Sequence, residues 1–257
     1  MSKKENYKNI WIVGTGRSGT HFLCRSLLCY ENIIDYLDGN ENKKLLIDIR
    51  ESILQNKSIN SSVLKYYEKI INKTMENNKI FIDQHHPNIW NFKALIENFP
   101  NSLFIFVNRD IKQIVSSMLN HKSIYSNLKI LIKNPETIYY PSQFYGIEKK
   151  ELLKEYNIIE LCALRVQSHK LRAKILSEDY PDNFIIINFD DLVLNKNILF
   201  NMIFSKFKFQ DLGVFKDNIV VNNKVLTKYE SNLSKLDIET LNNYEIKLKS
   251  IDINDNL

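Results

Sequence analysis

Cysteine, proline, glycine and tryptophan are all scarce in this sequence. Its 257 residues include 3 cysteines, 5 prolines, 6 glycines and 2 tryptophans. Cys24, Cys29 and Cys162 lie in apolar helical patterns without the spacing of a zinc site, which predicts buried, reduced thiols and excludes a disulfide-rich scaffold. Because no stretch rich in proline, glycine or serine interrupts the chain, we expect a single domain over residues 1–257.

Long hydrophobic runs and a large charge of one sign are also missing. No apolar run approaches the ~18 residues that a membrane-spanning helix needs, so we expect no membrane span. The polar N-terminal segment leads directly into a predicted strand, which predicts no signal peptide and a cytoplasmic location. Lysine and arginine number 35 against 30 acidic residues, a net charge of +5. This small excess does not indicate a nucleic-acid-binding protein, but it suits an anionic cofactor or acceptor.

Three of the six glycines lie within one short turn, Gly14–Thr20, which reads GTGRSGT. It joins a strand-like run, Ile10–Val13, to a helix-like run. Glycines let the backbone approach an oxyanion, and N–H groups at the start of the helix point toward it. The glycine spacing is that of a P-loop, but Thr20 stands where a Walker loop has lysine, and the positive charge is Arg17. The residues predict a loop that holds a phosphate or sulfate; the alternative is an ordinary tight turn.

Short apolar runs of strand type alternate with helical patterns along the chain. The expected strands are Ile10–Val13, Lys79–Asp83, Leu103–Val107 and Phe184–Asn188, and the expected helices are Thr20–Tyr30, Asn88–Asn98, Ile111–His121 and Asn157–Ser177. This alternation predicts an α/β fold in which helices flank a central parallel β-sheet, with a P-loop-like phosphate-binding loop after the first strand. Residues Lys43–Asn78 look helical and amphipathic, and the apolar spacing after Gln210 hints at a final helix or two.

Polar clusters follow directly on three of these strands. They are the glycine turn, the segment Gln84–His86, and the segment Asn108–Asp110. In a parallel sheet the carboxyl ends of the strands share one edge, and ligands bind there. The three clusters are therefore expected to converge on one site.

The turn GTGRSGT resembles the 5′-phosphosulfate-binding loop of sulfotransferases that use 3′-phosphoadenosine-5′-phosphosulfate (PAPS). A second block, RDIKQIVSS, resembles the family's 3′-phosphate motif, an arginine at the end of a strand and a serine eight residues on. Here these two residues are Arg109 and Ser117. With weaker echoes later in the chain, the resemblance covers most of the segment Ile10–Phe209.

The resemblance implies a sulfotransferase that moves the sulfuryl group of PAPS to a hydroxyl or amine of an acceptor, such as a glycan or a small molecule, and releases 3′-phosphoadenosine-5′-phosphate (PAP). It implies no metal. Arg17 would stabilise the leaving 5′-phosphate, and Arg109 with Ser117 would bind the 3′-phosphate. The remaining cofactor-binding residues would be Gly16, Ser18, Gly19, Thr20 and His21. The family often has a second threonine at the last of these positions, where His21 would donate to the phosphate or simply pack.

An acceptor must lose its proton during transfer, so a general base is expected. His85 and His86 precede Pro87 at the end of the second strand, where many family members have Lys-Thr-Pro, and a histidine pKa suits a base at neutral pH. Glu41 is the competing candidate, because some relatives, including protein-tyrosine sulfotransferases, have a catalytic glutamate roughly there. His86 is slightly favoured over Glu41, and a purely structural histidine is the alternative for both histidines.

Two further functions are compatible with the sequence. A nucleoside or small-molecule kinase would share the P-loop architecture, with Asp83 as a candidate for binding Mg²⁺, although the Walker lysine is absent. A non-catalytic module that binds PAP would keep the fold without turning over an acceptor. Nothing in the sequence identifies the acceptor.

Overall fold

Five parallel strands form one sheet in the computed structural model of the protein. The sheet has the order β2-β3-β1-β4-β5. The strands are β1 (Asn9–Val13), β2 (Ile33–Ile34), β3 (Ile80–Asp83), β4 (Ser102–Asn108) and β5 (Phe184–Asn188). The structure describes residues 7–35, 44–45, 47–49, 59–133, 156–209, 212–216, 219, 226–227, 229 and 232–249.

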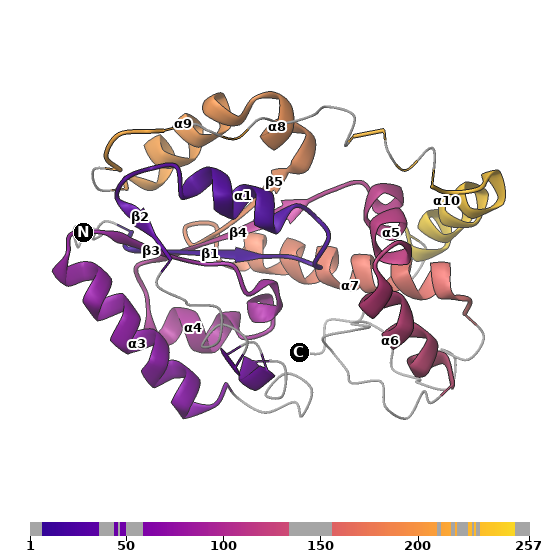
Figure 1. The fold of residues 1–257 in the computed structure, drawn as a ribbon, viewed down its shortest axis with the longest axis horizontal. Helices are drawn as coiled ribbons and strands as arrows, with labels where there is room; N and C mark the ends of the chain where they lie inside the picture. Colours follow the sequence, from indigo (N-terminus) through magenta and orange to yellow (C-terminus); the bar gives the residue numbers. More distant parts are fainter. Residues whose placement is uncertain are drawn as a thin grey trace.

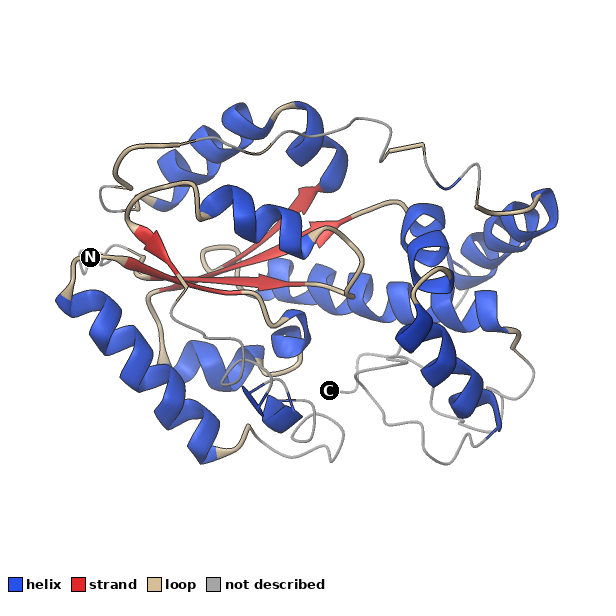
Figure 2. Cartoon of the chain, in the orientation of Figure 1, coloured by secondary structure: helices blue, strands red, loops and turns tan. Residues whose placement is uncertain are grey.

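Helices lie on both faces of this sheet (Figures 1 and 2). They are α1 (Thr20–Leu27), α3 (Ser61–Glu76), the 3₁₀ helix η1 (His86–Ile89), α4 (Phe92–Asn98), α5 (Ile111–Leu119), α6 (Lys122–Lys133), α7 (Ile158–Asp179), α8 (Phe189–Leu194), α9 (Lys196–Phe207) and α10 (Lys235–Lys249). In the view of Figure 1, α1, α8 and α9 lie above the sheet, and α3, α4 and α7 lie below it. The fold is therefore the α/β fold that the alternating pattern predicts.

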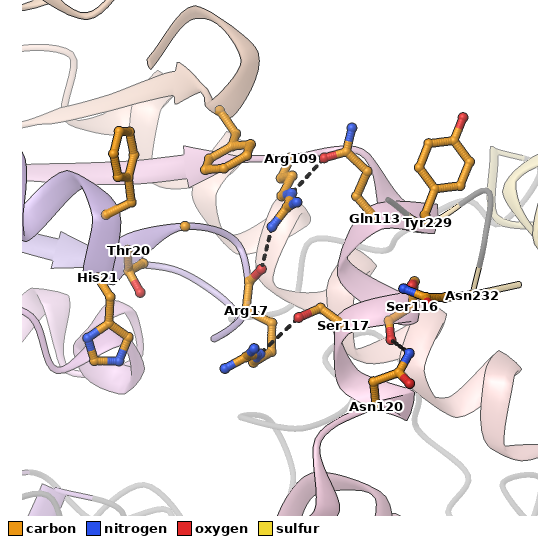
Figure 3. A pocket seen from close by; sticks show the side chains of 13 residues that line it. Arg17, Thr20, His21, Arg109, Gln113, Ser116, Ser117, Asn120, Tyr229 and Asn232 are labelled. Carbon is orange, nitrogen blue, oxygen red and sulfur yellow. Dashed lines mark hydrogen bonds between the residues drawn. The ribbon is translucent and has the colours of Figure 1, made fainter. Parts of the chain in front are cut away.

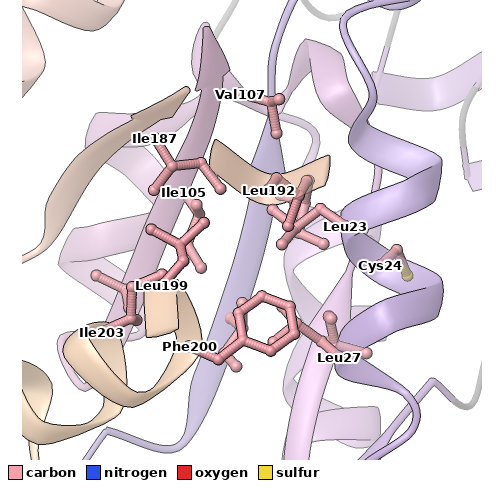
Figure 4. Packing of buried hydrophobic residues seen from close by; sticks show 14 of the residues in the cluster. Leu23, Cys24, Leu27, Ile105, Val107, Ile187, Leu192, Leu199, Phe200 and Ile203 are labelled. Carbon is pink, nitrogen blue, oxygen red and sulfur yellow. The ribbon is translucent and has the colours of Figure 1, made fainter. Parts of the chain in front are cut away.

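The central strand β1 is buried on both faces, which explains its unbroken apolar sequence. Ile10 and Ile12 belong to one cluster of buried residues, together with side chains of α1, α8 and α9 (Figure 4). Trp11 and Val13 belong to the opposite cluster, which contains side chains of α3, α4 and α7. Since successive strand residues point to opposite faces, one five-residue segment contributes to both cores.

The cluster below the sheet is rich in aromatic rings. Trp11 stacks on Phe104, with ring centroids 5.7 Å apart and an interplanar angle of 13°. Tyr67 of α3 packs edge-on against the same indole at 4.8 Å. Fully burying a side chain of this size stabilises the fold by about 1.5–3 kcal/mol. A third apolar cluster joins α5, the first half of α7 and α10 beyond the sheet.

Most expected elements agree with the structure to within a few residues. The four expected strands are present as β1, β3, β4 and β5. The remaining strand, β2, was not predicted, because two residues are too short to show an alternating pattern. The expected helix Asn88–Asn98 is divided into η1 and α4, with Pro87 in the first turn of η1.

Helix α3 occupies the second half of the expected helical stretch Lys43–Asn78, whose first half lies mostly outside the described residues. It begins where the Asn60 side chain accepts a hydrogen bond from the Ser62 N–H, 3.0 Å away. The expected helix near the end of the chain is α10. No helix in the described part of the chain has the length and apolar character that crossing a membrane requires.

The cysteines are free thiols, as the sequence predicts. Cys24 and Cys162 are buried, as expected, and belong to different apolar clusters, whereas Cys29 is only partly buried. Burial raises the thiol pKa of Cys24 and Cys162 to about 12. Both are therefore protonated and packed as small apolar side chains at neutral pH.

His169 of α7 is a buried histidine held in its neutral form. Its Nε2 accepts a hydrogen bond from the Trp90 indole at 3.3 Å, and its Nδ1 donates to the Arg165 carbonyl oxygen at 2.9 Å. Burial, followed by the charge of Arg165, lowers its pKa from 6.5 to about 3. A proton on this ring therefore opposes folding.

We expect this histidine to make stability pH-dependent. Below pH 6.5 His169 is protonated in the unfolded chain, whereas in the folded protein it stays neutral down to about pH 3. The free energy of unfolding therefore falls as the pH falls through this range. The loss is about 1.4 kcal/mol per pH unit from this group. His169→Gln, which keeps one donor and one acceptor, should reduce that slope in urea unfolding at pH 7 and pH 5. Equal slopes for the two proteins would contradict the assignment.

Candidate functional site

The loop between β1 and α1 lies at the carboxyl edge of the sheet. Three of its residues have a positive φ: Gly16 at 71°, Arg17 at 64° and Gly19 at 110°. Two are glycines, for which this region is open, whereas Arg17 is a strained exception. Gly19 caps α1 without a side-chain hydrogen bond, so the first N–H groups of the helix are available to an anion.

Ser18 is fully buried within this loop. Its Oγ has no hydrogen-bond partner among the described residues. A buried hydroxyl without a partner costs free energy, so Ser18 is an unfavourable feature of this loop.

Arg109, at the end of the neighbouring strand β4, forms a hydrogen bond with the strained loop. It follows β4, and its Nη1 donates to the carbonyl oxygen of Arg17 at 3.2 Å. Its Nε donates to Gln113 Oε1 at 2.6 Å. The ring of Phe189 lies under the guanidinium, with 4.1 Å from the ring centroid to Cζ. Three contacts thus fix the direction of this side chain.

The electrostatic surroundings of Arg109 leave it charged. Burial lowers its pKa from 12.5 to about 10, Arg17 acts in the same direction, and Asp190 and Asp110 oppose the shift. It therefore remains a cation at neutral pH. Two arginines side by side make this edge of the sheet attractive to an anion.

Helix α5 brings the second half of the predicted anion site to the loop. Asp110 caps the helix, since its Oδ1 accepts from the N–H groups of Lys112 and Gln113. Two turns later, Ser117 Oγ accepts a hydrogen bond from Arg17 Nε at 3.0 Å. Residues 100 positions apart in the sequence are therefore in direct contact.

A cavity of about 560 Å³ opens between the loop, α5 and the start of α8 (Figure 3). Its lining consists of Arg17, Gly19, Thr20, His21, Phe22, Arg109, Gln113, Ser116, Ser117, Asn120, Phe189, Tyr229 and Asn232. Six of these residues are predicted site residues. Gly16 and Ser18 belong to the same loop without lining the cavity.

Phe189 is one of the lining residues that the sequence did not suggest. It is buried, and it lies so close to Gly19 that an added Cβ there would be 2.4 Å from Phe189 Cδ2. The contact explains why glycine is required at this position for space as well as for φ. Phe189 follows β5, so only the assembled sheet brings it to the loop.

Tyr229 and Asn232 also come from a part of the chain without a recognisable motif. They precede α10 and lie on the far side of the cavity from the loop (Figure 3). Their signal in the sequence is no more than two polar residues in a loop. Packing of α10 on α7 within the third cluster brings this segment to the cavity.

The candidates for the base have different surroundings. His85 is buried, and its Nδ1 lies 2.6 Å from Asp83 Oδ2. His86 lies beside the loop, because a Cβ built on Gly16 would be 3.0 Å from His86 Nε2. The His86 carbonyl oxygen also accepts from the Gly14 N–H at 3.3 Å. Glu41 lies outside the described residues.

Asp83 is buried, and its carboxylate is hydrogen-bonded to neighbouring protein groups. It is 1 % exposed, and its two oxygens accept from the His85 N–H, the Tyr67 hydroxyl and the Asn88 amide at 2.8, 3.1 and 3.3 Å, besides the contact with the His85 ring. Within the described residues, no group of three or more His, Cys, Asp or Glu side chains could hold a metal ion.

His21 lies at the rim of the cavity, in the first turn of α1. Desolvation of its ring and the charges of Arg25 and Arg17 lower its pKa below the ordinary value of 6.5, and a hydrogen bond with Gln84 opposes the shift. The ring is therefore neutral in the protein at pH 7.

Comparison with solved structures identifies the architecture. No protein-family model matches the sequence, and no curated protein matches it. The sulfotransferase domain of the olefin synthase from Synechococcus PCC 7002 matches 97 % of this chain and 98 % of its own length, with a TM-score of 0.52 and 13 % identity. A sulfotransferase from Mycobacterium avium matches 97 % of this chain and 78 % of its own length, with a TM-score of 0.54 and 12 % identity.

The chain has the sulfotransferase fold. The expectation drawn from two short motifs thus agrees with the architecture along nearly the whole chain. At 12–13 % identity the likeness is one of fold.

Gly19→Ala should damage the cavity as well as the fold. The added Cβ meets Phe189 and φ is 110°, so we expect a loss of about 1–3 kcal/mol from backbone strain alone and displacement of the ring beneath Arg109. Gly213→Ala is the matched control, because Gly213 also has a positive φ, 71°, but does not line the cavity. Urea unfolding should show destabilisation in both variants. Thermal stabilisation by sulfate should disappear only in Gly19→Ala, and its persistence there would contradict the proposed contact.

Proposed function

We propose that this protein is a sulfotransferase that transfers the sulfuryl group of PAPS to a hydroxyl or amine of an acceptor, such as a glycan or small molecule. The observation that carries the proposal is the meeting of Arg17, Arg109 and Ser117 at one cavity. The sulfotransferase fold supports it, and so does the carboxyl-edge position of that cavity.

The residues present fit a nucleotide with phosphates at two ends. The loop offers helix N–H groups and the cation of Arg17 for the 5′-phosphosulfate. Arg109 and Ser117 offer a second cationic and hydroxyl pair for the 3′-phosphate. The two groups adjoin, because Arg17 contacts both Arg109 and Ser117. Gly16 and Gly19 keep the backbone close to the ligand.

Transfer forms a bond from the acceptor oxygen or nitrogen to sulfur and breaks the bond from sulfur to the bridging oxygen, which leaves on PAP. We expect charge to be spread over the transferred group and the leaving phosphate, as in phosphoryl transfer. Arg17 stabilises that charge with a guanidinium that can bind two oxygens. The N–H groups of Ser18, Gly19 and Thr20 bind the same phosphate.

The acceptor proton goes to a base beside the loop. Of the two histidines, His86 is the better candidate for the base, because its ring is next to Gly16 while His85 is buried against Asp83. In this proposal the Asp83–His85 pair holds the start of η1, and with it His86, at the loop. Glu41 is the alternative base, and a structural role is the alternative for His86.

A kinase is a poorer fit to the same cavity. Asp83, which the sequence suggests as a candidate for binding Mg²⁺, is buried and shares its oxygens among four protein groups. Thr20 occupies the position of the Walker lysine. A non-catalytic PAP-binding module would share every contact described, and turnover alone separates it from an enzyme.

PAP should stabilise the protein without a divalent metal, and ATP should do so much less, because only PAP has a 3′-phosphate for Arg109 and Ser117. At ~100 times its dissociation constant PAP should add about 2.7 kcal/mol. Thermal unfolding with PAP, ATP and ATP–Mg²⁺ at matched concentrations measures the difference. A larger shift with ATP–Mg²⁺ would reject the sulfotransferase in favour of the kinase.

Removal of Arg17 should mainly lower turnover, whereas removal of Arg109 should mainly weaken PAP binding. Arg17→Ala should lower turnover ~10²–10³-fold with a smaller loss of PAP affinity, because its charge acts where the leaving group gains charge. Arg109→Ala should weaken PAP binding by roughly 1.5–3 kcal/mol. It should also slow turnover, since its Nη1 holds the Arg17 carbonyl. Calorimetry with PAP gives the affinities, and transfer from labelled PAPS to an acceptor found by screening gives turnover.

Arg25→Ala is the control for both arginine variants. Arg25 is an exposed arginine in the last turn of α1 that does not line the cavity. Its removal should leave PAP affinity within a few-fold of the wild type. Equal losses of affinity and turnover in Arg17→Ala and Arg109→Ala would contradict the separate roles.

A further inference from the structure

His21 is the cavity residue that departs from the sulfotransferase pattern, which often has threonine there. Its ring lies at the rim, and Figure 3 shows it projecting from the chain in the same direction as the side chain of Arg17. An imidazole differs from a hydroxyl in one respect that matters here, because it can take up a charge near neutral pH.

The groups that act on this ring come from three elements. Arg17 lies in the loop, Arg25 is one turn along α1, and Gln84 follows β3. The two arginines oppose a third positive charge, and so does the desolvation of the ring. Only the Gln84 hydrogen bond favours the protonated form. The ring thus stays neutral first because it is desolvated, and second because Arg25 and Arg17 already place positive charge near it.

An anion bound beside Arg17 and His21 would reverse this balance. Its negative charge offsets that of the arginines and attracts a proton to the ring, and both effects favour the imidazolium. The protonated ring then donates a hydrogen bond to an anionic oxygen, which is stronger than a neutral one. The same position can therefore be neutral before the ligand enters and cationic afterwards.

We propose that His21 takes up a proton when the terminal anionic phosphate of the nucleotide enters the cavity, so that nucleotide binding is coupled to protonation. The proposal rests on the sulfotransferase function proposed above. In PAPS the 5′-phosphate is joined to sulfate in a mixed anhydride, whereas in PAP it is free and carries more negative charge. The coupling is therefore strongest for the product PAP. His21 becomes protonated as negative charge develops on the leaving phosphate.

Linkage turns this coupling into a measurable pH dependence. If PAP raises the pKa of His21 by one unit, PAP binds about tenfold more tightly below both pKa values than above them. The phosphates of PAP also titrate near pH 6, which weakens binding as the pH falls. The contribution of His21 is therefore the difference between the wild type and a variant without the imidazole.

The first experiment follows the ring directly. The protein has five histidines, so the Cε1–H signals can be resolved by ¹H–¹³C correlation NMR, and the His21 signal is the one lost in His21→Gln. In the free protein it should titrate below 6.5, and with saturating PAP its pKa should rise by one unit or more. The signals of the histidines that do not line the cavity are the reference for this comparison. An unchanged His21 titration with PAP bound would overturn the proposal.

The second experiment measures affinity between pH 5.5 and pH 8 by calorimetry, with PAP and with inorganic sulfate. Sulfate remains a dianion throughout this range, so its binding reports only on protein groups. Wild-type affinity should increase toward low pH by about tenfold for each unit of pKa rise, relative to His21→Gln. Identical pH profiles in the two proteins would overturn the coupling.

The two ideas fail in distinguishable ways. PAP that binds with no change in the His21 titration leaves the sulfotransferase proposal standing and removes the proton coupling. If sulfate raises the His21 pKa but PAP does not bind, the proton coupling holds for a simple oxyanion. That result rejects PAPS as the substrate. If neither ligand binds the wild type at any pH, both proposals are wrong.

Discussion

The parallel pairing of β1 with β4 is the constraint on which the rest of the site depends. Val13, the last residue of β1, is in register with Phe106, so the chain leaves both strands at the same edge of the sheet. The loop that follows β1 therefore meets the Arg109 side chain that follows β4. With β3 and β5 on either side of this pair, His86 and Phe189 are brought to the same place.

The apolar composition of the strands makes that pairing stable. β1 and β4 are buried on both faces between two clusters, one aliphatic in the main and the other aromatic. A polar edge with two neighbouring arginines opposes folding to some extent, because their charges repel and are partly desolvated. The strained φ of Arg17 adds to this cost. Such features are expected where binding an anion recovers the free energy, and they occur together at this cavity.

Much of the fold could be predicted because the responsible signals are local. Apolar runs, the glycine turn and the Asp110 cap lie within a few residues of the elements that they specify. Helices α6, α8 and α9 were not predicted, and three other features that escaped prediction have an identifiable physical cause. Strand β2 has only two residues, and η1 separates from α4 through the geometry at Pro87. Phe189 looks like an ordinary core residue in the sequence, since its contacts with Gly19 and Arg109 are made across the sheet.

By itself, the sequence determined that strands and helices alternate in a parallel α/β fold. It also determined that glycines in the loop permit positive φ angles, and which residue types are available to bind an anion. These follow from backbone conformation and hydrophobic periodicity, which are properties of neighbouring residues. Only the tertiary structure decided that Arg17 contacts Ser117, that Asp83 is enclosed by hydrogen bonds, and that His86 rather than His85 faces the loop. Those outcomes depend on strand order and on the distances between side chains far apart in the chain. Local patterns in the sequence predict that the strand ends share one edge, but they fix neither the order of the strands nor these distances.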